Sequence, residues 1–399
     1  MVVPLCVVLE LAERKKIQLM KALYLSEWYP HRYDAMAGLF VQKHAIAVAG
    51  QGVDVCVLYL HHDTQIKRLE ITDNTHDGIR EVIVYYPKGY LAALRKGWKY
   101  VRSKWGRPDV CQLNVITKNV LLPLWLKWRY KTPYIIIEHW SGYLPENGQY
   151  QQSSRLHHFL ARIAVKHASQ VLTVSQRLTE CMQASGLQHP RYGHINNVVE
   201  DFFFGRRAVA RKGDVHLLHV SCFDERAKNV CGLLRAVKQV AEKRKDFTLT
   251  IVGTGIDFEA VKAVAESLGL TKGIVTFTGE LTPAEVAEQF EQADVFVMNS
   301  NFENAPVVLS ESLATGTPII ATRVGGIPEM VPAHCGCLVS PRNDSELAKT
   351  IDFMLDHYSD FDPTAIRTEG QQYSFAAVGQ TLKKIYQSCM DSSAHTNKK

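Results

Sequence analysis

Short apolar runs alternate with amphipathic segments along most of the chain. Runs at 22–26, 53–60 and 133–138 in the first half, and at 217–221, 247–252 and 275–279 in the second, have the length of buried strands. Segments of helical length, such as 39–50 and 230–243, lie between them. Strands that alternate with helices indicate parallel sheets. The pattern therefore predicts an α/β protein in which two strand–helix series follow one another.

The basic segment 202–214 separates the two series, and we interpret it as a linker. It contains two glycines and four positive charges, Gly205, Arg206, Arg207, Arg211, Lys212 and Gly213. We therefore predict one domain over 21–203, a second over 214–370, and a helical C-terminal segment over 371–390. Residues 1–20 are left out of the fold prediction, because the first expected strand of the fold begins only at Lys21. Their charged group follows the apolar stretch, whereas in a secretory signal the positive charge comes first.

The densest candidate for a functional site lies between 294 and 329. The pattern predicts a strand over 294–298, a polar loop, a helix over 305–314 and a second short strand over 318–322. Loops at the carboxyl ends of parallel strands bind ligands in such sheets. Glu303 in the loop and Glu311 in the helix are about two helical turns apart, so they can face the same way. The free N–H groups of the helix start can hold a phosphate. The negative charge of Glu303 could equally have only a structural role, which is to stabilise the positive end of the helix dipole.

This stretch resembles the signature of the family 4 retaining glycosyltransferases, whose GT-B fold has two Rossmann-like domains facing across a crevice. The matching positions are Ser300, Glu303, Glu311, Ala314, Gly316, Pro318, Gly325, Gly326 and Glu329. The resemblance implies that the C-terminal helix crosses back to the N-terminal domain. It also implies transfer of a hexosyl-type sugar from a nucleotide-diphosphate sugar to an acceptor, with retention of configuration.

The resemblance assigns roles to individual residues. Glu303 would contact the donor sugar, and Glu311 would hold the ribose of the nucleotide. His139 follows the strand at 133–138, and Lys228 occupies the position of a lysine that neutralises the diphosphate. The catalytic residues expected from the resemblance are therefore Glu303, His139 and Lys228.

The remaining donor contacts implied by the resemblance fall in five loops. The family has an arginine five residues before the lysine; Phe223 stands there, and Arg226 is a candidate substitute. Gly38 and Gly253 would let the backbone approach the ligand closely, although Gly253 in its Gly-x-Gly could also only turn the chain. The other expected contacts are Gly279, Glu280, Leu281, Asn304, Ala305, Pro306 and Val307.

Composition limits the classes of partner. The chain is 46% hydrophobic and 22% charged, as in an ordinary globular protein, and its net charge of +6 is too small to favour nucleic acid. The nine cysteines show no zinc-site spacing and fit a reducing cytoplasm. The single Asp-x-Asp, at 360–362, lies far from the other motifs, so we expect a surface loop, no metal and no resident cofactor. The co-substrate would be a UDP- or GDP-linked sugar.

A basic aromatic segment at 88–107 leaves two interpretations open. Leucine, tryptophan and valine recur at helical spacing between Lys and Arg, and 125–131 adds a second such stretch. Such a helix suits the surface of a membrane, and it equally suits packing against its own domain with the charges in water. With membrane contact, the enzyme would work at the inner face of the membrane. In either case we expect the acceptor to be a glycan or a lipid-linked glycan in cell-surface polysaccharide synthesis.

Two alternatives to a transferase remain at the level of sequence. A nucleotide-sugar epimerase of the same fold would need no acceptor. A non-catalytic nucleotide-sugar-binding partner protein would keep the fold without turnover, and Phe223 and the unusual Asn304-Ala305-Pro306 are compatible with it.

Overall fold

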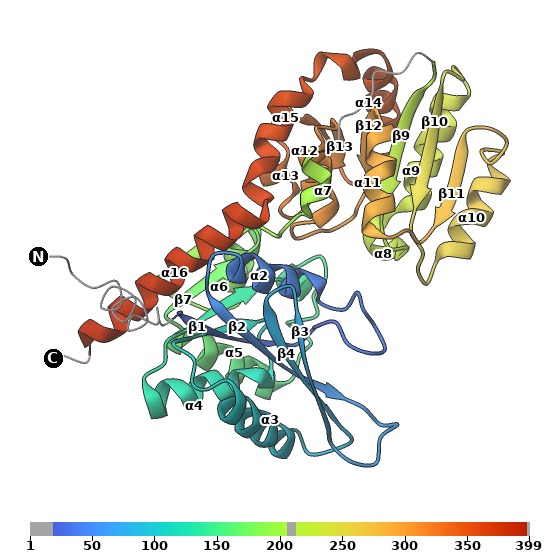
Figure 1. Ribbon diagram of the computed structural model, residues 1–399. Helices are drawn as coiled ribbons and strands as arrows, with labels where there is room; N and C mark the ends of the chain where they lie inside the picture. The colour runs from blue at the N-terminus through green and yellow to red at the C-terminus, as the bar shows by residue number, and fades with distance from the viewer. Residues whose placement is uncertain (1–18, 206–212, 397–399) are drawn as a thin grey trace, which may run out of the picture.

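The computed structural model describes residues 19–205 and 213–396, which form two α/β domains (Figure 1). Residues 1–18 and most of the predicted linker, 206–212, lie outside this range. The first domain holds an eight-stranded sheet and the second a six-stranded sheet. The α/β class and the two Rossmann-like sheets predicted from the sequence are confirmed.

The N-terminal sheet has the strand order β3-β4-β2-β1-β5-β6-β7-β8. All neighbouring strands are parallel except β3, which pairs antiparallel with β4 at the edge. This β3–β4 hairpin was not predicted from the sequence. The strands are β1 (Lys21–Ser26), β2 (Asp54–His62), β3 (Glu70–His76), β4 (Ile79–Tyr86), β5 (Val110–Asn114), β6 (Tyr134–Glu138), β7 (Gln170–Thr173) and β8 (Tyr192–His194).

Helices cover both faces of this sheet because its central strands are apolar on both sides. One core cluster joins the sheet to the side carrying α3 to α6, and the other joins it to α2 and α16. The helices of the domain are α2 (Leu39–Ala49), α3 (Tyr90–Lys104), α4 (Leu121–Tyr130), α5 (Arg155–His167) and α6 (Gln176–Ala184), with short turns η1 (Lys118–Val120) and η2 (Ser141–Tyr143).

The second sheet is wholly parallel, with the strand order β11-β10-β9-β12-β13-β14. Its strands are β9 (Val215–Val220), β10 (Phe247–Val252), β11 (Val275–Gly279), β12 (Val295–Met298), β13 (Ile319–Thr322) and β14 (Gly336–Val339). Its helices are α7 (Asp201–Phe204), α8 (Glu225–Lys228), α9 (Val230–Ala241), α10 (Phe258–Ser267), α11 (Pro283–Gln292), α12 (Val307–Thr315), α13 (Ile327–Met330), α14 (Asp344–His357) and α15 (Pro363–Gly370), with η3 (Tyr358–Asp360) and η4 (Gln371–Tyr373).

The C-terminal helix α16 (Phe375–Thr396) crosses from the second domain to the first and packs on α2, which confirms the crossing expected from the resemblance (Figure 1). A Cβ on Gly379 would lie 2.1 Å from the carbonyl oxygen of Ala47, so only glycine permits this close approach. Further along the helix, the buried Tyr386 hydroxyl lies 2.7 Å from that of Tyr24 and donates to Gln112 at 2.5 Å. These contacts anchor the helix in the core of the N-terminal domain.

Helix α12 begins two residues later than the sequence pattern predicted. Pro306 is its N-cap, with an extended ψ of 123°, and the helical residues start at Val307. A proline also disfavours helical backbone in the residue before it, here Ala305. The loop between β12 and α12 is therefore longer than expected, and it carries the candidate site.

Candidate functional site

Glu303 lies in the loop after β12 and is held by two side chains. Lys228, at the end of α8, forms an ion pair with one carboxylate oxygen. Ser300 donates a hydrogen bond to the same oxygen at 2.9 Å. The Glu303 and Lys228 side chains are only 11% and 16% exposed. The carboxylate and its cation are thus fixed together before any ligand binds.

Backbone contacts hold the loop of Lys228 against the loop of Glu303. The Asn301 N–H donates to the carbonyl of Ala227 at 2.7 Å, and the Asn299 amide donates to that of Asn229 at 3.1 Å. Burial lowers the pKa of Lys228, but the attraction of Glu303 outweighs it and the net shift is upward. Lys228 therefore stays a cation, as neutralising a diphosphate requires.

The first of two neighbouring cavities, which we call the apolar cavity, has a volume of about 440 Å³ and lies between the domains. It is lined mainly by carbon atoms, as nucleotide sites usually are. The expected donor residues that line it are Gly38, Gly253, Glu280, Leu281, Val307 and Glu311. Gly279 lies next to them, and its carbonyl accepts a hydrogen bond from the Gly253 N–H at 2.8 Å.

The second cavity, which we call the polar cavity, has a volume of about 300 Å³ and is lined by both Lys228 and Glu303. Trp140 and Ser141 line it from the N-terminal domain, and Arg226 lines it from the second domain. The loop after β9 contributes to both cavities, the loop before α12 lines the polar cavity, and α12 itself lines the apolar cavity. A ligand with an apolar base and a polar sugar could therefore occupy both, with its phosphates at the start of α12.

Glu311 faces the apolar cavity from α12 and lies near two charged residues, Lys43 and Glu200, that the sequence pattern did not link to it. Burial raises its pKa to about 7, although the nearby Lys43 cation opposes this shift. Lys43, on α2, also lines the cavity and forms an ion pair with Glu200 at 3.3 Å. Lys43 is a candidate site residue that we missed. The only signal was a single lysine in the mostly apolar segment 39–49.

Phe223 does not contact the cavities through its side chain, which corrects the expectation of a donor contact. Its ring is fully buried and packs against the rings of Phe258 and Phe277 in the core. An aromatic ring gains more from that burial than from facing water. Arg226 does not take over the missing arginine's place at the apolar cavity; it lies over the ring of Phe302, 5.2 Å from its centre, and lines the polar cavity.

His139 lies between the two domains but lines neither cavity. Its ring packs 4.2 Å from that of Phe40, and its carbonyl accepts a hydrogen bond from the Asn304 amide at 2.8 Å. Burial holds the pKa of His139 well below its usual value, so the imidazole is neutral. The preceding Glu138 fixes this turn by accepting hydrogen bonds from the N–H groups of His139 and Trp140, both at 3.0 Å.

The segment 304–306 joins the domains instead of lining the cavities. The Ala305 carbonyl accepts a hydrogen bond from the Asn197 amide at 3.0 Å, and the Asn304 carbonyl accepts one from the Gly326 N–H at 3.0 Å. A Cβ on Gly326 would lie 2.2 Å from that Asn304 oxygen. The glycines of the family signature therefore shape the Glu303 loop by allowing a second backbone to pass against it.

Glu329, at the end of that signature, links the domains. Its two carboxylate oxygens accept hydrogen bonds from the Gln176 and Arg177 N–H groups, at 2.6 and 2.9 Å. These are free N–H groups at the start of α6, where a negative charge is favoured. Glu329 thus has a positioning role that the pattern alone did not reveal.

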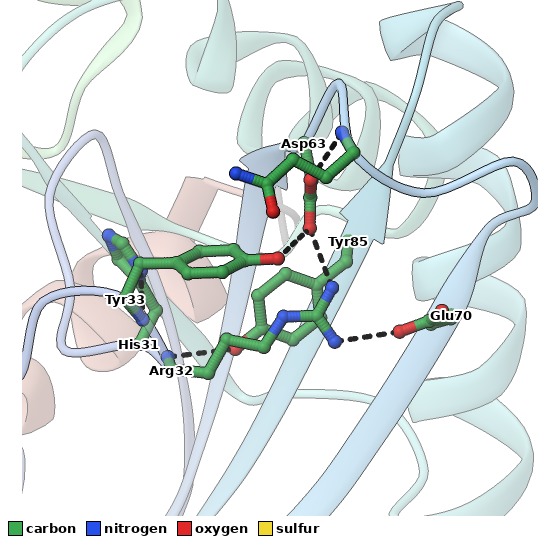
Figure 2. A network of polar contacts seen from close by, with 7 residues as sticks. His31, Arg32, Tyr33, Asp63, Glu70 and Tyr85 are labelled. Atoms are coloured by element: carbon green, nitrogen blue, oxygen red, sulfur yellow. Dashed lines mark hydrogen bonds and ion pairs between the residues drawn. The ribbon is translucent and has the colours of Figure 1, made fainter.

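The loop after β1 is fixed to the N-terminal domain by a polar network (Figure 2). Arg32 forms ion pairs with Asp63 at 2.6 Å and with Glu70 at 2.7 Å, and Tyr33 donates to the same Asp63 oxygen at 2.7 Å. Burial alone would raise the pKa of Asp63, but these bonds lower it to about 2. Both sides of the Arg32 guanidinium are occupied, so this arginine is not available to a phosphate.

The Asp-x-Asp at 360–362 has a local structural use. Asp362 caps α15 by accepting from the Thr364 N–H at 2.9 Å, and Asp360 contacts His357 at 3.0 Å. Across residues 19–205 and 213–396, no group of three or more His, Cys, Asp or Glu side chains is arranged to hold a metal ion. The eight cysteines in the same ranges are free thiols.

Two family models match this chain. "Glycosyl transferase 4-like domain" matches residues 37–197, and "Glycosyl transferases group 1" matches residues 214–357. The fold and the site together define a glycosyltransferase of the GT-B class. The chain belongs to family 4 of these glycosyltransferases, as its signature residues indicated.

Curated relatives are distant. An uncharacterized glycosyltransferase of Methanocaldococcus jannaschii is 24% identical over 67% of this chain and 72% of its own length. A D-inositol 3-phosphate glycosyltransferase of Corynebacterium diphtheriae is 29% identical, but the match covers 39% of this chain and 38% of that protein. The chain thus spans well under half of the inositol phosphate relatives it matches.

Solved structures agree in fold at low identity. Sucrose-phosphate synthase from Thermosynechococcus elongatus superposes with a TM-score of 0.72 at 18% identity, covering 93% of this chain and 100% of that one. Anabaena HepE in complex with UDP-glucose superposes with a TM-score of 0.69 at 17% identity, covering 92% and 100%.

Proposed function

We propose that this protein transfers a hexosyl-type sugar from a nucleotide-diphosphate sugar to an acceptor, with retention of configuration. The observation that carries the proposal is the largely buried Glu303–Lys228 pair at the wall of the polar cavity, beside the start of α12. Breaking a glycosyl–phosphate bond builds positive charge on the sugar and negative charge on the leaving diphosphate. A fixed carboxylate beside a fixed cation matches that separation of charge.

Each group then has one task. Lys228 and the N–H groups at the start of α12 stabilise the departing diphosphate. Glu303 holds the hydroxyls of the donor sugar, and the leaving phosphate takes the proton of the acceptor. We propose no metal and no resident cofactor for this step, because Lys228 supplies the countercharge. The apolar cavity takes the nucleotide, with Glu311 on its ribose; HepE, a protein of the same fold, has been solved with UDP-glucose.

Glu311 gives the first prediction, which tests the donor site through its pH dependence. Only the carboxylate form accepts two ribose hydrogen bonds. Because its pKa lies at about 7 in the free protein, affinity for the donor should rise about tenfold between pH 6 and 8. Nucleotide sugars are the right probes, since their diphosphate does not ionise in this range. Calorimetry against UDP- and GDP-sugars would measure the effect.

Glu311→Gln is the matching variant. It should weaken donor binding by about ten- to a hundredfold and remove the pH dependence. Glu138, whose pKa burial also raises to about 7, remains in this variant, so it serves as an internal control. A pH dependence that persists unchanged in Glu311→Gln would reject the ribose role. Failure of every nucleotide sugar to bind would reject the proposed function.

We further propose that the enzyme works in the cytoplasm at the inner face of the membrane, on a glycan or lipid-linked glycan. No helix within the described residues is both long and apolar enough to cross a bilayer. The apolar stripe of α3 packs on its own domain: a Cβ on Gly97 would lie 2.9 Å from Val84 and 3.0 Å from Leu58. Any contact with lipid must therefore come from the outer side of that helix and its neighbours.

That outer side is strongly basic and carries exposed apolar side chains. Helices α3, α4 and α5 contain five, two and three Lys or Arg, and no Asp or Glu. The three helices adjoin: Trp98 contacts Trp125, and Lys127 bonds to the His167 carbonyl. Their exposed apolar residues are Leu91, Trp125, Trp128, Leu156 and Phe159. Basic charge with exposed tryptophan suits an anionic lipid surface.

The second prediction is binding to anionic vesicles. The protein should float with vesicles of phosphatidylglycerol and phosphatidylcholine at low salt, and binding should fall as salt screens the attraction. Exchanging Lys96 and Lys99 for glutamine and Trp128 for alanine should remove most of it. The matched control exchanges Lys262 and Lys272, exposed in the other domain, for glutamine. No flotation of the wild type at low salt would refute the membrane proposal.

A further inference from the structure

A third cavity, which we call the arginine pocket, lies between the domains next to the polar cavity. Its volume is about 580 Å³. Arginines from both domains line it, and Glu146 supplies the only carboxylate among its lining residues. The four arginines are Arg177, Arg226, Arg323 and Arg342. None of the functions assigned above uses this concentration of positive charge.

Three of these arginines have no carboxylate partner in the described part of the chain. Arg177 pairs with Glu146 at 3.6 Å. By contrast, Arg226 lies over the Phe302 ring, Arg323 reaches the Leu338 carbonyl at 3.5 Å, and Arg342 donates to the Asn301 amide oxygen at 3.2 Å. These are neutral partners. The pocket thus differs from the environment of Arg32, whose two carboxylates already neutralise its charge.

The geometry of Arg342 supports a built site. Its backbone has a φ of +57°, in the left-handed region that side chains other than glycine seldom adopt. Such strain costs free energy and collects at functional sites. The hydrogen bond to Asn301 holds the Arg342 guanidinium against the loop that leads from β12 to Glu303. The strained backbone therefore presents an unneutralised cation beside the candidate reaction centre.

The arginine pocket adjoins the polar cavity, because Arg226 and Phe302 line both. In the proposed function, the donor diphosphate lies at Lys228 and the start of α12, which do not line this pocket. An anion here must therefore belong to a different part of the substrates. The open side of the donor sugar is where an acceptor has to approach.

We propose that the arginine pocket binds a phosphate group carried by the acceptor, so that the enzyme acts on phosphorylated glycans or sugars. Guanidinium forks match the oxygen geometry of phosphate and stay charged at any pH of interest. Three such groups around one site neutralise a phosphate dianion. The assignment of this phosphate to an acceptor rests on the proposed function, whereas anion binding in the pocket can be tested independently of that function.

The test is calorimetry with glucose 6-phosphate, with glucose as the neutral control, both with and without a saturating nucleotide. The wild type should bind glucose 6-phosphate and not glucose. Arg323→Gln combined with Arg342→Gln should weaken that binding by at least about tenfold, while nucleotide affinity is unchanged. Lys262→Gln combined with Lys272→Gln removes the same charge from the same domain at exposed positions, and it should change binding by less than about twofold.

Each outcome decides a separate point. Equal loss of glucose 6-phosphate binding in the arginine and lysine variants would overturn the proposal. It would indicate only a nonspecific electrostatic attraction between the positively charged side chains of the domain and the anion. Arg323→Gln alone avoids the Asn301 contact and covers the case in which the double variant misfolds. The wild type could also bind UDP-glucuronate more tightly than UDP-glucose. If only the arginine variant lost that preference, the pocket would hold a charged donor sugar, and the proposal of an acceptor phosphate would be overturned. Absent nucleotide binding with intact phosphate binding would refute the proposed function and leave the anion site standing.

Discussion

Glu303→Gln should reduce kcat by about 10²–10³-fold while leaving the affinity for the free nucleotide within about threefold of wild type. Glutamine keeps the shape and the hydrogen bond from Ser300 but removes the negative charge that faces the developing positive charge of the sugar. Free nucleotide lacks that sugar, so its binding should not respond. Turnover of the donor and calorimetry with the free nucleotide measure the two quantities.

The matched control is Glu288→Gln, an exposed glutamate on α11 of the same domain. It removes one negative charge from a residue that lines neither cavity, and it should leave both quantities unchanged. Full turnover in Glu303→Gln together with a collapse of nucleotide affinity would contradict the role of Glu303, because it would make this residue a ribose ligand.

Lys228→Gln should have an effect on kcat/KM of similar size, about 10²–10³-fold, because it removes the countercharge of the leaving diphosphate. It should also destabilise the fold. Removing one partner of a largely buried ion pair leaves the other charge uncompensated, at a cost of about 3–5 kcal/mol. Glu303 would be that remaining charge.

The double variant Lys228→Gln/Glu303→Gln separates the two effects. It replaces a buried pair by two neutral side chains, so much of the lost stability should return. Activity should not return, because neither charge of the transition state is then matched. Recovery of turnover in the double variant would show that the pair is only structural, and denaturant titration beside the activity assay would reveal it.

The regular elements and the loop of Glu303 could be predicted from the sequence because they depend on local patterns. The apolar run 294–298 gave β12 within one residue. The helical spacing assumed for Glu303 and Glu311 does not apply, because α12 begins only at Val307, and the two glutamates line neighbouring cavities. The alternation of strands and helices likewise predicted two parallel sheets, except for the antiparallel β3, which lies at an edge where a hairpin is the simplest connection.

Contacts between distant segments were not predictable in the same way. Phe223 occupies an arginine's position in the family pattern, and nothing local shows that its ring turns into the core. Lys43 reaches Glu200 and the apolar cavity only after α2 docks on the linker side of the domain. The arginine pocket assembles residues from six separate segments, so no single stretch of sequence carries its signal.

Proton NMR of the donor during turnover distinguishes retaining transfer from a nucleotide sugar from every alternative reaction. The donor that binds most tightly is incubated with enzyme, and the anomeric proton of the first sugar product is followed before mutarotation. We expect a product with the donor's own anomeric configuration, which is released with nucleoside diphosphate and is lost in Glu303→Gln. A product of inverted configuration, an epimerised donor that keeps its nucleotide, or no turnover with any acceptor would contradict it.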